Sequence, residues 1–135
     1  MRRTANHGTM PDRGLLLALL LTSCISSAET ISFEADVLPI LNQYCVMCHI
    51  SGAEQAELVL YPDAWSQLVG VSSSQSELSR VEPGNADKSY LYLKLIGAQD
   101  TEGGSGLQMP FQQGPLSASQ IELIRFWIEQ GAKNN

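Results

Sequence analysis

The segment best equipped to do chemistry is Cys45-Val46-Met47-Cys48-His49. Two cysteines three positions apart, followed at once by a histidine, form the Cys-x-x-Cys-His pattern of covalent c-type haem attachment. On one helical turn both thiols project to the same side, where they can meet the two vinyl groups of a single haem. The imidazole of His49 then lies beneath the iron as the proximal ligand. The pattern therefore predicts one covalently bound haem c.

Three other uses of these cysteines compete with haem attachment. A structural zinc site takes four protein ligands, usually Cys or His, and only Cys45, Cys48 and His49 remain beyond the N-terminal segment. A Cys-x-x-Cys redox pair normally accompanies a thioredoxin-like sheet, and no alternating strand pattern occurs here. A structural disulfide leaves His49 without a role. Haem attachment is the favoured interpretation, with the redox pair and the disulfide as the open alternatives.

The second axial ligand of the iron is predicted by elimination. His7 lies in the N-terminal segment, so no second histidine is left, and Met47 lies inside the attachment turn and cannot reach the opposite face. Met109 lies far downstream, in a Gly-rich, Pro-stiffened loop of a kind that can fold over a haem. The alternative is an ordinary loop methionine, with water, lysine or nothing on the iron. A thioether favours the reduced iron, so a fairly high reduction potential is expected.

Residues 1–28 are predicted to be a signal peptide. The basic residues Arg2, Arg3 and Arg13 precede an apolar run at residues 15–21, in the order that export signals have. The run is shorter than the about 20 residues that span a bilayer. The protein is therefore expected to be exported, into a bacterial periplasm.

Two ways of processing this signal remain open. Leu21-Thr22-Ser23-Cys24 resembles a bacterial lipobox, in which Cys24 becomes the lipidated first residue and anchors the domain to a membrane. Ser26-Ser27-Ala28 resembles an ordinary signal-peptidase site, and with that cleavage Cys24 is discarded. In either case residues 29–135 are expected to form the functional domain.

The composition suits one compact domain after the signal, since the 135 residues are 44% hydrophobic and 16% charged. Fourteen acidic and eight basic residues give a formal net charge of −6. Nucleic acid is a poor partner for this balance, because phosphate contacts need a Lys/Arg surface. A protein with a basic patch is a better partner. Membrane contact is expected only through a lipid on Cys24.

A helix is predicted at the start of the domain, before the cysteines. Its apolar positions follow helical spacing, and they are Phe33, Val37, Ile40, Leu41 and Tyr44. Because proline is tolerated only in the first turn of a helix, Pro39 places the helix from near Val37 to about Met47.

The middle of the chain predicts two further helices. A short one is expected within residues 62–69, followed by an exposed Ser-rich loop over residues 70–79. Residues 85–87 are predicted to cap a third helix, which ends at Gly97.

The last predicted helix has the clearest signals. Ser117 and Gln120 form a capping box, Gly131 supplies a stop, and Trp127 is expected to pack on the first helix. Its apolar face consists of Ile121, Ile124, Trp127 and Ile128. Since no strand pattern is present, the predicted fold is all-α, with about four helices and long loops.

Several segments together resemble one family. They are Phe33, Asp36-Val37-x-Pro39-Ile40-Leu41, the Cys45–His49 motif, Pro83-Gly84-Asn85, Ser89-Tyr90-Leu91, Met109-Pro110 and Trp127-Ile128-x-x-Gly131-Ala132. Over residues 33–133 the chain resembles the class I cytochromes c, and within them the planctomycete-type cytochrome c domain. One departure is that His49 is followed by Ile50-Ser51-Gly52, where the family commonly has an immediate glycine.

The resemblance implies a helical fold in which the first and last helices cross beside the haem. It also implies Cys45 and Cys48 as attachment sites, with His49 and Met109 as axial ligands. Two basic residues, Arg80 and Lys94, can pair with haem propionates, but solvated surface charges are the commoner case. Core packing is likewise the commoner role for the aromatic residues Tyr44, Trp65, Tyr90, Tyr92 and Trp127.

The function expected from these features is one-electron transfer by a mono-haem carrier that is not an enzyme. A saturated iron has no open position for a substrate, which favours a carrier over catalysis. The alternatives are a peroxidase-like or small-ligand-binding haem enzyme with a labile sixth ligand, and a haem-bearing sensor or structural subunit. Partners of the carrier are expected to be redox proteins with basic docking surfaces.

Overall fold

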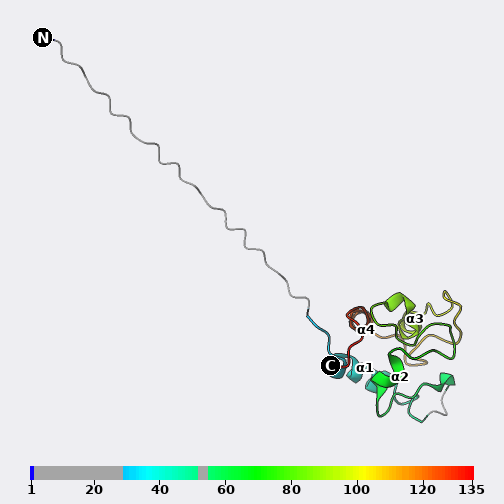
Figure 1. Ribbon diagram of the computed structural model, residues 1–135. Helices are drawn as coiled ribbons and strands as arrows, with labels where there is room; N and C mark the ends of the chain where they lie inside the picture. Colours follow the sequence, from blue (N-terminus) through cyan, green and yellow to red (C-terminus); the bar gives the residue numbers. More distant parts are fainter. Residues whose placement is uncertain (2–28, 52–54) are drawn as a thin grey trace.

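The computed structural model describes residue 1, residues 29–51 and residues 55–135. These residues form four α-helices joined by long loops, and they contain no β-strand (Figure 1). The predicted all-α class with about four helices is therefore confirmed for the described part. The predicted signal peptide and Cys24 lie outside the described residues. The helices are α1 (Leu38–Tyr44), α2 (Ala64–Leu68), α3 (Tyr90–Ile96) and α4 (Ala118–Glu129).

The first α-helix begins close to the predicted residue, Val37, but ends earlier than predicted. A π-helical turn, η1 (Phe33–Val37), precedes α1, and the Ser32 side chain caps it by accepting a hydrogen bond from the backbone N–H of Ala35. This turn places Pro39 in the first turn of α1, where a missing N–H costs little. The helix ends at Tyr44 because Cys45 already has a non-helical backbone. The π-helical turn before α1 has no sequence signal of its own, so it was not predicted.

Helix α2 lies within the predicted range, with Asp63 as its N-cap. The Asp63 carboxylate accepts a hydrogen bond from the backbone N–H of Ser66 at 3.2 Å. The loop that follows is held at two places by isolated β-bridges, Val69 to Val81 and Ser72 to Ser79. This loop is therefore tied back to the segment that leads into α3.

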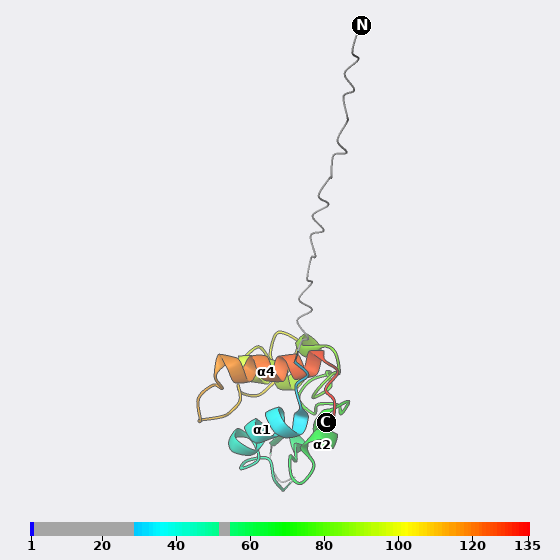
Figure 2. The same cartoon turned by 90° about the vertical axis from the view of Figure 1, so that its left-hand side faces the viewer.

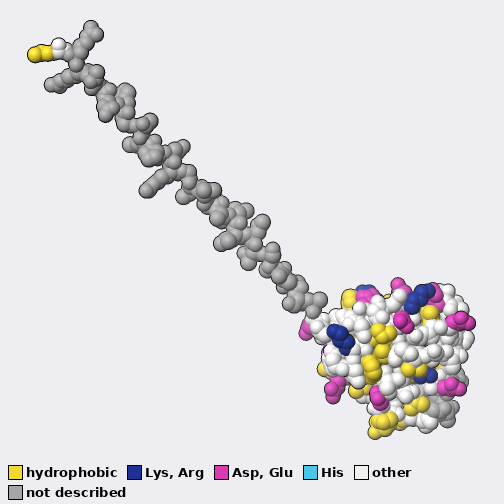
Figure 3. All heavy atoms as spheres, in the orientation of Figure 1, with side chains coloured by type: hydrophobic (Ala, Val, Ile, Leu, Met, Phe, Trp, Pro, Cys, Tyr) yellow, Lys and Arg dark blue, Asp and Glu magenta, His cyan; other side chains and the backbone are white. Residues whose placement is uncertain are grey.

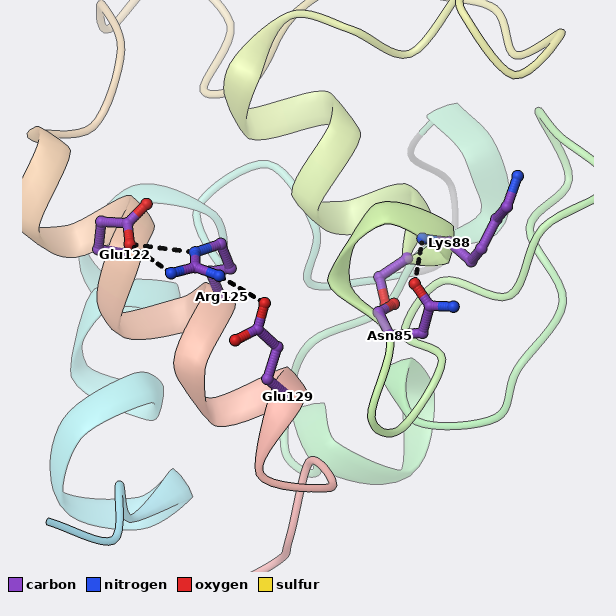
Figure 4. A network of polar contacts seen from close by, with 6 residues as sticks. Asn85, Lys88, Glu122, Arg125 and Glu129 are labelled. Atoms are coloured by element: carbon purple, nitrogen blue, oxygen red, sulfur yellow. Dashed lines mark hydrogen bonds and ion pairs between the residues drawn. The ribbon is translucent and has the colours of Figure 1, made fainter. Parts of the chain in front are cut away.

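The start of α3 differs from the prediction, whereas its end agrees. Asn85 caps a short 3-10 turn, η3 (Ala86–Lys88), by accepting a hydrogen bond from the backbone N–H of Lys88 (Figure 4). The asparagine cap is used by that turn, and α3 begins only at Tyr90. Its C-cap is Gly97 with φ 73°, the left-handed conformation that glycine adopts without strain.

Helix α4 carries the predicted capping box, in which Ser117 and Gln120 satisfy each other's backbone. On its outer side Arg125 pairs with Glu122 and Glu129 (Figure 4). On its inner side Trp127 is 1% exposed, and its ring centroid lies 5.2 Å from that of Phe33. The last helix thus packs on the first helical segment, as predicted (Figure 2).

The two ends of the domain are joined as well as packed. The backbone N–H of Glu34 donates to the carbonyl of Asn135 at 3.0 Å, and the Ser32 hydroxyl donates to the same oxygen at 2.7 Å.

Acidic and basic side chains are scattered among apolar ones on the face seen in Figure 3. No helix within the described residues is both long enough and apolar enough to cross a membrane.

Candidate functional site

One cavity of about 480 Å³ brings the predicted site residues together. Cys45, Cys48 and His49 line it from the turn after α1, and Met109 lines it from the loop after α3. The volume is within the range of small-molecule and cofactor sites. Most of the other lining side chains are apolar, and they include Leu58, Leu60, Leu68, Leu91, Leu95, Leu107, Pro110 and Phe111.

The attachment motif forms a tight turn at the end of α1. The backbone N–H of Cys45 donates to Leu41, and the N–H groups of Cys48 and His49 both donate to the carbonyl of Cys45 at 3.1 Å. These bonds fold the three side chains towards the same cavity. Both cysteines are free thiols, with Cys45 half-buried and Cys48 exposed.

Electrostatics keep the first of these thiols protonated. Burial, and then the neighbouring Cys48, raises the pKa of the Cys45 thiol to about 11. Redox-active and nucleophilic cysteines have the opposite property, a lowered pKa that yields a thiolate. The surroundings of Cys45 therefore disfavour the redox-pair alternative.

The imidazole of His49 is oriented by a backbone carbonyl. Its Nδ1 lies 3.2 Å from the carbonyl oxygen of Leu58. Because a carbonyl oxygen only accepts, Nδ1 donates in this contact. A ring N–H held by a backbone carbonyl is a common feature of metal-binding histidines.

The segment that carries Met109 is tied to the helix before it. The backbone N–H of Met109 donates to the carbonyl of Lys94 at 3.0 Å, and the Gln108 side chain donates to the carbonyl of Leu95 at 3.0 Å. Further along, Gln113 donates to the carbonyl of Tyr44 at 3.3 Å. The loop thus bridges α3 and the end of α1, with the half-buried Met109 between.

Two cations, Arg80 and Lys94, line the cavity, and none of its described lining residues carries a carboxylate. Lys94 is only 7% exposed, and burial lowers the pKa of its ammonium. Arg80 donates to the carbonyls of Gln67 at 2.9 Å and Glu57 at 3.1 Å. The expectation of a solvated surface charge is therefore wrong for Lys94, because the loop after α3 folds over it, whereas Arg80 is half-buried.

The aromatic residues divide between the cavity and the core. Tyr44 and Tyr90 line the cavity. The indole N–H groups of Trp65 and Trp127 instead donate to the carbonyls of Ala132 and Lys133. The tryptophans therefore hold the C-terminal segment in place, and the core-packing prediction is confirmed for them.

Sequence reasoning missed several groups that shape the site. The carbonyl of Leu58 orients His49, but a backbone atom leaves no signal in the sequence. Ser73 and Gln75 line the cavity from a loop predicted to be merely exposed. Their proximity depends on the two β-bridges that fold this loop back, and those bridges are too short to give a strand pattern.

Within residues 29–51 and 55–135, no three His, Cys, Asp or Glu side chains converge as a metal-ion site. Neither a family model, nor a curated protein, nor a solved structure matches this chain. The function is therefore inferred from the cavity and the residues that line it.

Proposed function

We propose that the protein is a mono-haem c-type cytochrome of the class I fold that transfers single electrons in the bacterial periplasm. The observation that carries this proposal is that Cys45, Cys48, His49 and Met109 line one apolar cavity. The first three are neighbours in the sequence, whereas Met109 comes from a loop beyond α3. The fold therefore brings Met109 to the same cavity as the attachment motif, although the two are far apart in the sequence.

The residues of the cavity fit a haem in their chemistry. Two thiols in one turn supply the groups that form thioether bonds, and the apolar side chains supply walls for the porphyrin faces. Arg80 and Lys94 supply positive charge for the carboxylates of the cofactor. His49, through its imidazole, and Met109, through its thioether, would be the side chains that hold the iron.

When bound, the haem supplies a one-electron ferric/ferrous couple. The chain's own residues set the conditions for it. The Leu58 carbonyl fixes the imidazole of His49, and the hydrogen bond from Met109 to Lys94 fixes the thioether's segment. With a side chain on each axial position no site is left for a substrate, so the proposed role is that of a carrier and not of an enzyme.

The location and partners are part of the same proposal. The predicted signal would deliver the chain to the periplasm, with Cys24 as a possible lipid anchor. The net charge of −6 favours redox partners with basic docking surfaces, and it disfavours nucleic acid. Electron exchange with a basic partner should then slow as ionic strength rises, and a rate unaffected by salt argues against this choice of partner.

The test uses protein made with a cytochrome c maturation system. Optical and magnetic circular dichroism spectra should show a low-spin haem with a sulfur-to-iron charge-transfer band. Met109→Ala should abolish that band and open the iron to carbon monoxide. Met47→Ala is the matched control, because Met47 is 80% exposed. A wild-type protein that binds carbon monoxide rapidly would instead support the ligand-binding alternative.

A further inference from the structure

Lys94 is a buried charged group, and its contacts go beyond the positive charge that the proposed function assigns to it. Its ammonium donates to the carbonyl of Ser105 at 2.7 Å and to that of Leu107 at 3.1 Å. Its own carbonyl accepts the N–H of Met109 at 3.0 Å. One residue of α3 therefore holds the loop segment from Ser105 to Met109 by three hydrogen bonds, from both its side chain and its backbone.

Tyr90 reinforces this contact one turn earlier on α3. Its hydroxyl donates to the carbonyl of Ser105 at 2.5 Å and accepts from the N–H of the same residue at 3.0 Å. The ammonium of Lys94 lies 5.4 Å from the centre of the Tyr90 ring, within the range of a cation–π interaction. The ring and the ammonium together grip Ser105.

The glycines of the loop fit this close approach. A Cβ added at Gly106 would lie 2.6 Å from Nζ of Lys94, and one added at Gly104 would lie 2.4 Å from Cε2 of Tyr90. Two bonds pin the ammonium, so it cannot move aside without breaking one of them. A side chain at residue 106 would therefore act first on Lys94, and the side-chain amide of Gln75, at 3.1 Å, is its next neighbour.

Burying an ammonium without a carboxylate partner is costly. The described hydrogen bonds of the Lys94 ammonium go to the backbone carbonyls of Ser105 and Leu107. Hydrogen bonds from a charged donor are about twice as strong as neutral ones, so they offset the cost of burial when residues 105–107 lie in the observed position. Lys94 therefore stabilises this one position of the segment that ends at Met109.

We propose that Lys94 is a positioning residue for Met109, which sets how firmly the thioether is held against the iron. This inference rests on the proposed function, because it takes Met109 as an axial ligand. It predicts that loss of the ammonium loosens the loop, weakens the sulfur–iron bond and leaves covalent attachment at Cys45 and Cys48 unaffected.

The first test compares Lys94→Met with Lys88→Met in the matured full chain. Lys88 is an exposed lysine that pairs with Glu102. Lys94→Met should keep one haem per chain but weaken the sulfur-to-iron band and bind added imidazole at least tenfold more tightly. Lys88→Met should match the wild type in each measurement. A Lys94→Met protein with the wild-type band and imidazole affinity overturns the inference.

The second test uses a pair of glycines matched in backbone strain. Gly106 has φ 78° and Gly103 has φ 72°, but a Cβ at Gly103 meets nothing within 4 Å. Gly106→Ala should raise imidazole affinity as Lys94→Met does, and Gly103→Ala should not. In a Lys94→Ala background the change at Gly106 should have a smaller effect, since the displaced ammonium is gone. Equal effects of Gly106→Ala and Gly103→Ala on imidazole affinity would refute the positioning role of Lys94.

The readouts separate this inference from the proposed function. If wild-type protein carries no haem or lacks the sulfur-to-iron band, the proposed function fails, and Met109 loses its assigned role with it. If the wild type carries haem and shows the band, and the variants do not differ from it, only the positioning role of Lys94 fails. Amide hydrogen exchange at Met109 adds a measurement independent of the haem spectrum. Its exchange should be at least tenfold faster in Lys94→Met, with exchange in α4 unchanged.

Discussion

The Nδ1 atom of His49 lies 3.2 Å from the carbonyl oxygen of Leu58, nine residues further along the chain. This contact orients the imidazole before any ligand is considered. Leu60 strengthens this arrangement, because its backbone N–H donates to the carbonyl of His49 at 2.7 Å. The segment after the attachment motif therefore folds back and holds the histidine at both its side chain and its backbone.

This relationship predicts that the Nδ1 proton of His49 exchanges slowly with solvent. It is engaged with a carbonyl in a half-buried position, so exchange requires the segment around Leu58 to open. Nuclear magnetic resonance of ¹⁵N-labelled reduced protein measures this proton directly. An Nδ1 proton that exchanges as fast as that of free imidazole contradicts the assigned orientation.

Arg80 is predicted to raise the reduction potential of the site. A cation at the cavity wall stabilises the reduced iron, which carries one positive charge fewer than the oxidised iron. Arg80→Met should therefore lower the midpoint potential. An interaction worth about 1.4 kcal/mol corresponds to roughly 59 mV for a one-electron couple. Redox titration measures the change, and Arg125→Met is the control because Arg125 pairs with Glu122 and Glu129 away from the cavity lining. An unchanged or higher midpoint potential in Arg80→Met would contradict the prediction.

The contact between Phe33 and Trp127 is predicted to dominate the stability of the helix crossing. Phe33 is 4% exposed, so Phe33→Ala should lower the free energy of unfolding by about 3–5 kcal/mol, as for other large core truncations. Phe126→Ala removes the same side chain from a 43% exposed position and should cost well under half as much. Denaturant unfolding of the matured proteins provides both values. Equal decreases in the free energy of unfolding for Phe33→Ala and Phe126→Ala would contradict the prediction that the Phe33–Trp127 contact dominates.

Because of Tyr92, we expect the free energy of unfolding to fall slightly as the pH becomes alkaline. Burial, and then the charge of Glu122, raises the pKa of its hydroxyl above the ordinary value of 10.0. As pH rises through 10, the unfolded chain loses this proton before the folded protein does, so stability falls. Tyr92→Phe should therefore gain stability relative to wild type between pH 8 and pH 11. A difference between the two proteins that stays constant over this range contradicts the prediction.

Local signals in the sequence predicted the ends of several helices correctly. The Ser117 and Gln120 capping box and the Gly97 stop depend only on neighbouring residues, and both occur in the structure. The Asn85 cap also occurs, but it serves the short turn η3 in place of α3. A capping residue identifies a helical start without specifying how far that helix extends, which explains the difference.

Some non-local features could be predicted from residue type and spacing, and others could not. The motif Cys45–His49 and Met109 could be selected by type and spacing, and the structure places them on one cavity. The burial of Lys94 and the half-buried position of Arg80 could not be predicted in this way, because charged residues are usually solvated. Their environment is created by carbonyl groups of residues 57, 67, 105 and 107, which converge only in the folded chain.

The central claim is that Cys45 and Cys48 are joined by thioether bonds to one haem, and denaturing mass spectrometry tests it most directly. Protein produced with a maturation system should retain the mass of one haem after unfolding, located on the peptide that contains residues 45–49. Replacing both cysteines with alanine should remove that mass. A wild-type polypeptide with only its own mass under these conditions would contradict the account.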